Sequence, residues 1–362
     1  MESPNLKIPT YLKLAQIIIG LIGLFYILYV GQDIIIPVIF AVIIGILLNP
    51  VVNFLVKKGV NRVVAISLAL VGLIIVGAGI GFFIGSQLAH FVDTLPQFKQ
   101  KFQVLQKDAI DWVSQTFNVS KPRITTWMAE TRKGLASSSI IGKTLGAMTS
   151  LLVLVILPVY TFLVLYYKPR ILEFIERLFK KKDHDVVDEV LRETKTLIQG
   201  YLIGLSIEAT IVAIMNSAAL LIIGVQYAVL LGVIGALLNL IPYLGGLIAI
   251  ALPMLVALAT GSPIDVLWVL IAYIVVQFID NNFLVPKIVG SKVRLNALIS
   301  IIIVLVGNAI WGIPGMFLSI PLTAILKVIF DRIDALKPFG FVLGDEESTK
   351  RGFALKRHDG AQ

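Results

Sequence analysis

Residues 237–250, LLNLIPYLGGLIAI, interrupt an apolar run that extends from Tyr227 to Ala259. The interruption consists of Pro242, Gly245 and Gly246. Proline lacks the N–H that a helix interior needs, and glycine adopts conformations that other residues avoid. Two explanations fit: a single long helix that is kinked here, or a chain that turns back on itself at these residues.

The composition indicates a polytopic membrane protein. Of 362 residues, 57% are hydrophobic and 15% are charged, and the mean hydropathy is +0.92. Several apolar runs reach the roughly eighteen residues that a helix needs to cross a bilayer. The chain has no cysteine, which excludes disulfides and thiolate chemistry. Its net charge of +9 is typical of basic cytoplasmic loops and needs no nucleic-acid partner.

The apolar runs cover residues 14–30, 34–56, 63–88, 145–167, 200–224, 227–259, 265–285 and 296–330. The first run lacks a small-residue cleavage site, so we expect a retained span and not a signal peptide. Residues 168–199 separate two of the runs. They begin with an apolar helix face, Ile171, Phe174, Ile175 and Leu178, followed by Lys180–Lys182, as in a helix lying on an anionic cytoplasmic leaflet.

A second long interruption, residues 89–144, carries an apolar seam with coiled-coil spacing. The seam consists of Phe91, Leu95, Phe98, Phe102, Leu105, Ala109 and Trp112. The sequence Phe117–Pro122 predicts the end of this helix. The seam packs either on the membrane domain of its own chain or between subunits.

Basic residues set the orientation of the spans. Lys57, Lys58 and Arg62 place the loop after the second run inside, and alternation then places residues 89–144 outside. If the run 227–259 crossed once, the basic loop with Lys287 would lie outside. A run that enters and leaves on the outer side restores the rule. Each arm then has about fifteen residues and a length of about 22 Å, so we predict a re-entrant hairpin.

The last run repeats this pattern. Residues 308–321, NAIWGIPGMFLSIP, break it at Trp311–Gly315, and the same argument predicts a hairpin that enters from inside. Glu208 stands as far before Pro242 as Asp280 stands before Pro314. Hairpins of opposite orientation in an inverted repeat are typical of secondary transporters. The alternative is an ordinary kink in each run.

Two acids inside apolar runs are the candidate ion-coupling residues, Glu208 and Asp280, because a buried charge in a span is costly unless it has a function. The alternatives are that Asp280 pairs locally with Lys287 and that Glu208 lies near the cytoplasmic surface. The candidate substrate pathway comprises the polar residues near the acids and the hairpin tips: Asn239, Pro242, Tyr243, Gly245, Gly246, Gln277, Asn281, Asn282, Asn308, Trp311, Gly312, Pro314 and Gly315. Capping of broken helix ends is the alternative role for the two asparagines before the tips.

Signatures of enzymes are absent from the sequence. There is no HExxH, and the only histidines, His90, His184 and His358, lie outside the apolar runs. Residues 137–144, SSSIIGKT, approach a phosphate-binding loop, but Ser137 stands in place of the first glycine. We therefore expect no enzyme, no cofactor, no metal and no nucleotide, so that transport would run on a gradient.

Residues 231–258, LGVIGALLNLIPYLGGLIAIALPMLVAL, and 277–327, QFIDNNFLVPKIVGSKVRLNALISIIIVLVGNAIWGIPGMFLSIPLTAILK, resemble the autoinducer-2 exporter family of bacterial inner-membrane proteins. The resemblance implies export of autoinducer-2 or related small solutes, pentamers, and an elevator-like movement of the hairpin half. Some relatives are sodium(lithium)/proton antiporters. Many have Glu where this chain has Asp280; the shorter acid keeps the charge and moves it by one methylene group.

The resulting prediction is an all-α, polytopic integral membrane protein with eight hydrophobic segments, interpreted as six spans and two re-entrant helical hairpins of opposite orientation. Its parts are an N-terminal scaffold (1–88), an extracytoplasmic helical cap (89–144), a fourth span (145–167), cytoplasmic amphipathic helices (168–199), a transport unit (200–333) and a polar cytoplasmic tail (334–362). We expect a secondary exporter of autoinducer-2 or a related solute in the bacterial inner membrane, with both termini cytoplasmic. The alternatives are a sodium(lithium)/proton antiporter and a membrane scaffold or regulatory protein. The expected partners are a small-molecule substrate, the lipid bilayer and further copies of the chain.

Overall fold

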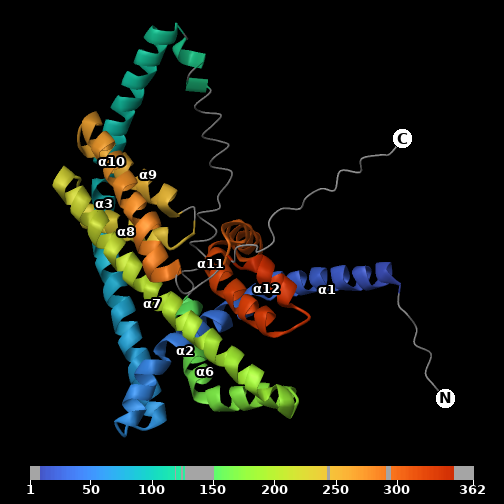
Figure 1. Cartoon of the computed structure of the whole chain (residues 1–362). Helices are drawn as coiled ribbons and strands as arrows, with labels where there is room; N and C mark the ends of the chain where they lie inside the picture. The colour runs from blue at the N-terminus through green and yellow to red at the C-terminus, as the bar shows by residue number, and fades with distance from the viewer. Residues whose placement is uncertain are drawn as a thin grey trace, which may run out of the picture.

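The structure is a computed structural model that describes residues 9–118, 120–123, 125–126, 151–242, 245–290 and 295–345. Every regular element in these ranges is a helix (Figure 1). The elements are α1 (Thr10–Val30), α2 (Gln32–Lys57), α3 (Arg62–Phe117), α6 (Leu151–Leu178), η1 (Lys181–Asp183), α7 (His184–Ile223), α8 (Ala228–Asn239), α9 (Gly245–Thr260), α10 (Pro263–Ile279), η2 (Asp280–Gly290), α11 (Ala297–Arg332) and α12 (Lys337–Leu343).

Six helices in the described ranges are long and apolar enough to cross a membrane. They are α2, the first part of α3, α6, α7, α10 continued by η2, and α11. The prediction of an all-α polytopic membrane protein is confirmed. The six differ in part from the six predicted spans: α11 is included because of its length although it is broken, and α1 counts as a shorter apolar helix.

The first predicted break is present in the structure. Helix α8 ends at Asn239 and α9 begins at Gly245, and the two helices pack against each other. A Cβ atom added to Gly245 would overlap the carbonyl oxygen of Leu238, at the end of α8. The chain can make this tight turn because glycine has no side chain at the point of closest approach.

The second predicted break lies inside α11. Gly312 has φ 62° and ψ −140°, a backbone conformation that favours glycine, and it separates two helical arms. A Cβ atom on Gly307 would overlap the carbonyl oxygen of Gly315. Eight residues of straight helix would separate these two positions by about 12 Å. The two arms of α11 therefore fold back onto each other at Gly312.

Helix α3 runs without interruption from the membrane into the predicted cap. It ends at Phe117, followed by Asn118 in the left-handed conformation, where the sequence predicted a break. Its C-terminal part projects beyond the ends of α9 and α10 (Figure 1). The ring of Phe91 packs edge-on against Tyr227 at 5.4 Å between centroids. The side chains of Leu95, Phe98, Phe102, Leu105 and Ala109 lie outside the described part of the chain.

Of the four apolar cores among the described residues, two have the most buried residues. One joins α2, α3 and α6 around Leu48, Ile66 and Leu165. The other joins α7 to α10 around Leu220, Leu231 and Val269. Helix α7 also crosses η2 closely, because a Cβ atom on Gly204 would lie 2.7 Å from the carbonyl oxygen of Ile288. This crossing fixes the part of α7 that carries Glu208, one turn later, against η2.

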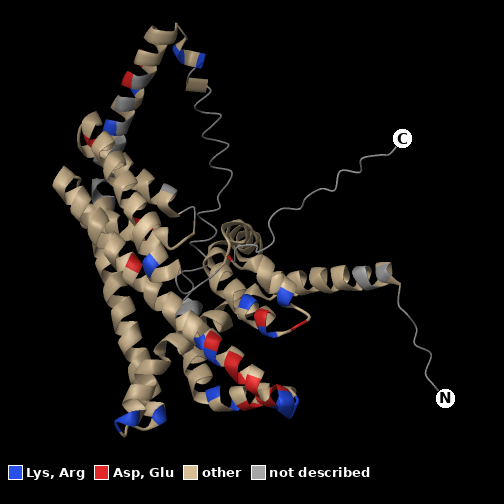
Figure 2. Cartoon of the chain, in the orientation of Figure 1, with Lys and Arg blue, Asp and Glu red and all other residues tan. Residues whose placement is uncertain are grey.

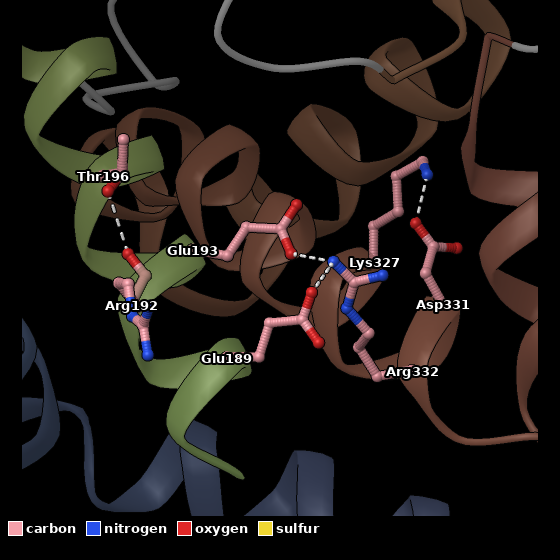
Figure 3. A network of polar contacts seen from close by, with 7 residues as sticks. All are labelled: Glu189, Arg192, Glu193, Thr196, Lys327, Asp331 and Arg332. Carbon is pink, nitrogen blue, oxygen red and sulfur yellow. Dashed lines mark hydrogen bonds and ion pairs between the residues drawn. The ribbon is translucent and has the colours of Figure 1, made fainter. Parts of the chain in front are cut away.

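A polar network ties the N-terminal end of α7 to the end of α11 (Figure 3). Arg332 forms ion pairs with Glu189 and Glu193, each at 2.8 Å. Glu189 and Glu193 lie one helical turn apart, so both reach the same guanidinium group. The network anchors the C-terminal arm of α11 to the cytoplasmic extension predicted for residues 168–199.

Candidate functional site

The turn between α8 and α9 places Asn239 next to both acids. Its Nδ2 atom donates hydrogen bonds to Asp280 Oδ2 at 2.7 Å and to Glu208 Oε1 at 3.3 Å. Glu208 comes from the middle of α7, Asp280 is the first residue of η2, and Asn239 is the last residue of α8. Three segments that are distant in the sequence thus meet at one polar cluster.

Both acids of this cluster are buried inside an apolar bundle. Glu208 is 3% exposed and Asp280 is 1% exposed. Their carboxyl groups lie close together, because both accept a hydrogen bond from the same Asn239 amide nitrogen. Among the described residues neither forms an ion pair with a Lys or Arg, so Asp280 does not pair with Lys287 there. Two adjacent carboxylates repel when both are charged, and a proton or a metal cation between them relieves this repulsion.

The cluster opens into a cavity of about 910 Å³. This volume lies within the range of about 300–1,000 Å³ that is usual for small-molecule sites. Its polar lining is Tyr201, Glu208, Asn239, Tyr273, Gln277, Asp280, Asn281 and Ser300, and its apolar lining includes Leu205, Ile250, Leu270, Ile274 and Val285. Apolar walls with few converging polar groups suit a small polar solute that sheds its water on entry.

The tip between α8 and α9 forms one wall of this cavity. Pro242 and Gly246 line it, and Gly245 supports it by its contact with Leu238. A Cβ atom on Gly246 would lie 2.6 Å from Gln277 Oε1, so the start of α9 packs directly on a polar lining residue. Tyr243 lies outside the described residues.

Asp280 marks the point where the α-helix changes its winding. Helix α10 continues directly into η2, a π-helix of 11 residues. A π-helix has a wider turn and frequently occurs at functional sites. Within it Asn281 lines the cavity and accepts a hydrogen bond from Gln277 at 3.3 Å. Asn282 instead donates to the carbonyl oxygen of Phe278 at 2.8 Å and does not line the cavity.

The tip of α11 lies away from this cavity. None of Asn308, Trp311, Gly312, Pro314 and Gly315 lines it; α11 contributes Ser300 and Ile320. The indole N–H of Trp311 donates to the carbonyl oxygen of Leu28 in α1 at 2.8 Å. The backbone of Gly315 packs closely against Gly307, and Asn308 is exposed.

Tyr273 of the cavity lining and Asn216 beside it escaped the sequence analysis. Tyr273 is 5% exposed and Asn216 is 3% exposed, and the Tyr273 hydroxyl and Asn216 Oδ1 have no hydrogen-bond partner in the described part of the chain. Both approach Gly235 of α8, at 3.1 Å and 3.4 Å from a Cβ atom placed there. Asn216 is a polar residue inside an apolar run, as Glu208 is, so the same criterion would have predicted it as a site candidate.

One carboxylate oxygen of Asp280 forms no hydrogen bond within the described part of the chain. This oxygen, Oδ1, is buried. A buried carboxylate oxygen without a partner is costly. The free lone pairs therefore point to a ligand that supplies a proton or a positive charge at this place.

Comparison with known proteins gives this site its context. Residues 17–335 match the family model described as "AI-2E family transporter". The chain belongs to the AI-2E transporter family. It is 23% identical to the "AI-2 transport protein TqsA" of Escherichia coli (strain K12) over 91% of this chain and 95% of that protein. It is 24% identical to the "Putative transport protein YhhT" of the same organism over 94% and 95%, and 28% identical to the "Putative transport protein YrrI" of Bacillus subtilis (strain 168) over 82% and 86%.

Membership confirms the resemblance seen in the sequence. This AI-2E family member is a multi-pass membrane transport protein, and a transporter family agrees with the prediction that the chain is no enzyme. The family match covers every described element that lines the cavity. The cavity with its carboxyl pair is therefore the candidate transport site.

Proposed function

We propose that this chain exports a small polar solute, autoinducer-2 or a related polyhydroxylated signal molecule, through the cavity between α7, α8, α10 and η2. The observation that carries the proposal is the meeting of Glu208, Asn239 and Asp280 at the end of a broken helix. Broken helix ends at a polar site inside the bilayer are where secondary transporters bind their substrates. The name of one relative, an AI-2 transport protein, supports the solute class.

The polar lining suits a solute rich in hydroxyl groups. Gln277 and Asn281 each bring an amide that both donates and accepts hydrogen bonds, and Tyr273 brings a hydroxyl without a partner in the described chain. The apolar wall around Ile250 and Ile274 covers the carbon face of a small ring. The carboxyl pair takes up the proton or cation whose gradient drives the movement.

Alternating access would come from an elevator-like movement of the transport unit, residues 200–333, against the scaffold. In this proposal the α8–α9 turn and the α11 turn are the tips of two re-entrant hairpins of opposite orientation. Two features support it. Each broken run folds back at glycine. Glu208 and Asp280, which stand equally far in sequence before their prolines, bond to the same Asn239 amide. A two-fold axis that passes near the site would bring equivalent acids together in this way. Pro242 and Pro314 are not related in the same way, because Pro242 lines the cavity and Pro314 does not.

A sodium(lithium)/proton antiporter is the second candidate function. The carboxyl pair favours it, because an antiporter needs an acid that alternates between a proton and a metal ion. In that case the pair itself is the transport site and the rest of the cavity is an aqueous access path. For either function we propose an inner-membrane location with both termini cytoplasmic, and a homo-oligomer in the form of a pentamer.

Filling the cavity tests the proposal. Ile274 and Val275 are neighbours on α10 with similar exposure, 58% and 50%, but only Ile274 lines the cavity. Efflux of labelled autoinducer-2 and of Na⁺ is measured from proteoliposomes with wild type, Ile274→Trp and Val275→Trp. We expect Ile274→Trp to slow autoinducer-2 efflux and Val275→Trp to behave as wild type. Equal autoinducer-2 efflux from the wild type and both variants would contradict the proposal. Efflux of Na⁺ without efflux of autoinducer-2 would favour the antiporter.

A further inference from the structure

A second, smaller pocket lies at the other end of the bundle, between α2, α3 and α6. Its volume is about 270 Å³, and it is lined by Val52, Asn53, Val56, Arg62, Lys168, Pro169 and Leu172. None of these residues belongs to the transport cavity. The lining combines two cations with apolar side chains, which is an unusual pairing at the edge of an apolar bundle.

Neutral groups hold both cations in place. Arg62 Nη2 donates to the carbonyl oxygen of Leu165 at 2.9 Å, and this bond links α3 to α6. Lys168 Nζ donates to Asn49 Oδ1 at 2.8 Å, and this bond links α6 to α2. Asn49 is 5% exposed, so it fixes the ammonium group from within the core. Each cation keeps further N–H donors that these bonds do not use.

The charge at this pocket is uncompensated in the described part of the chain. Neither Arg62 nor Lys168 forms an ion pair with an acid there. Arg62 and Lys168 line the same pocket, so two positive charges lie close together there. Two more basic residues, Lys57 and Lys58, lie at the end of α2, next to the turn before α3. Figure 2 shows basic residues gathered at this turn. An anion bound between Arg62 and Lys168 would relieve this repulsion.

The position and the walls of the pocket indicate which anion. Basic residues put the α2–α3 turn on the cytoplasmic side, at the level of the lipid headgroups. Val52, Val56 and Leu172 form the apolar side of the pocket, and Val56 is 39% exposed. A ligand with an anionic phosphate and an attached apolar part satisfies both halves of the lining, and basic pockets between membrane helices bind such headgroups.

We propose that the Arg62–Lys168 pocket binds the phosphate group of an anionic phospholipid from the cytoplasmic leaflet. The guanidinium fork and the ammonium group contact the phosphate oxygens, and the apolar wall receives the start of the acyl chains. The bound lipid would thereby connect α2, α3 and α6, the helices of the first apolar core. The proposal does not depend on the nature of the transported solute.

Native mass spectrometry of the detergent-solubilised full chain tests this site. Retention of phosphatidylglycerol and of phosphatidylcholine is compared, with inorganic phosphate added as a competitor. The variants are Arg62→Gln/Lys168→Gln and the control Lys101→Gln/Lys107→Gln, which removes two exposed charges of α3 outside the pocket. We expect wild type and the control to prefer phosphatidylglycerol by about tenfold, and the pocket variant to lose this preference, because hydrogen bonds to ionised groups are the strong ones.

The variant Val56→Trp tests the apolar side of the pocket independently of its positive charge. This substitution fills the apolar side and keeps both cations, and Val56 is 39% exposed, so the larger ring has room at the surface. We expect it to lose phosphatidylglycerol as well. Phosphatidylglycerol retention at the control level in both Arg62→Gln/Lys168→Gln and Val56→Trp would overturn the proposal. Displacement of the lipid by millimolar inorganic phosphate would assign the pocket to a soluble anion and would overturn it too.

Discussion

Replacing Gly245 by alanine perturbs the α8–α9 turn with the smallest possible change. The added Cβ would overlap the carbonyl oxygen of Leu238 and lie 2.7 Å from the Cα of Asn239. Both atoms belong to the backbone, so the clash is relieved only when α8 and α9 move apart. Such a movement displaces Asn239, whose amide bonds to Asp280 at 2.7 Å.

The expected cost follows from two opposing effects. Overpacking of a close contact costs about 1–3 kcal/mol. Alanine is favoured over glycine by up to about 1 kcal/mol in a helix interior, and this gain is smaller at Gly245, the first residue of α9. We therefore expect a net destabilisation of about 1–2 kcal/mol. Gly79 in α3 is the matched control, because a Cβ atom there meets nothing within 4 Å. Gly79→Ala should be neutral or stabilising.

The assay measures both folding and transport. Thermal unfolding in detergent should place Gly245→Ala below wild type and Gly79→Ala at or above it. Solute efflux from proteoliposomes should fall by about 5- to 30-fold for Gly245→Ala, because a cost of about 1–2 kcal/mol added to the transport barrier corresponds to that change in rate. Wild-type efflux and thermal stability in Gly245→Ala would refute the argument, because the turn would then tolerate displacement.

Three further predictions concern the cluster, the topology and the cap. Asn239→Leu should insert and fold but lose transport, because it removes the donor to Asp280 and Glu208; unchanged efflux would remove Asn239 from the site. Single cysteines at Ile264 and Lys287, in a chain without cysteine, should react with an impermeant reagent from opposite faces, Ile264 from outside; reaction from one face would contradict the two hairpins. Deleting residues 93–113, three heptads of α3, should lower the oligomer order in native mass measurements, whereas an intact oligomer would show that the seam packs within one subunit.

The sequence predicted the parts of the site that depend on local chemistry. Glu208 and Asp280 were found because a charge inside an apolar run is costly, and the breaks at Pro242 and Gly312 because proline and glycine interrupt helices. The ending of α3 at Phe117 followed from the same rules. These signals are short in range. In the structure both acids are buried and the helices are interrupted near Pro242 and at Gly312.

Features that depend on packing escaped the sequence. The meeting of Glu208 with Asp280 requires the crossing of α7 and η2 at Gly204, which no local pattern reveals. Trp311 was expected along the pathway, but its N–H bonds to Leu28, distant in the sequence. The boundary predicted at residue 88 marks a change in composition, and α3 continues through it because backbone hydrogen bonds do not depend on side-chain polarity.

Coupling through the carboxyl pair is the central claim, and one measurement tests it most directly. Solute efflux is recorded from proteoliposomes under imposed proton and Na⁺ gradients, with wild type, Asp280→Asn and Asp334→Asn. Asp334 is an exposed acid that pairs with Lys337 at 2.6 Å, so it controls for the loss of one charge. We predict that either gradient drives efflux in wild type and Asp334→Asn but not in Asp280→Asn. Gradient-driven efflux that persists in Asp280→Asn would contradict the account.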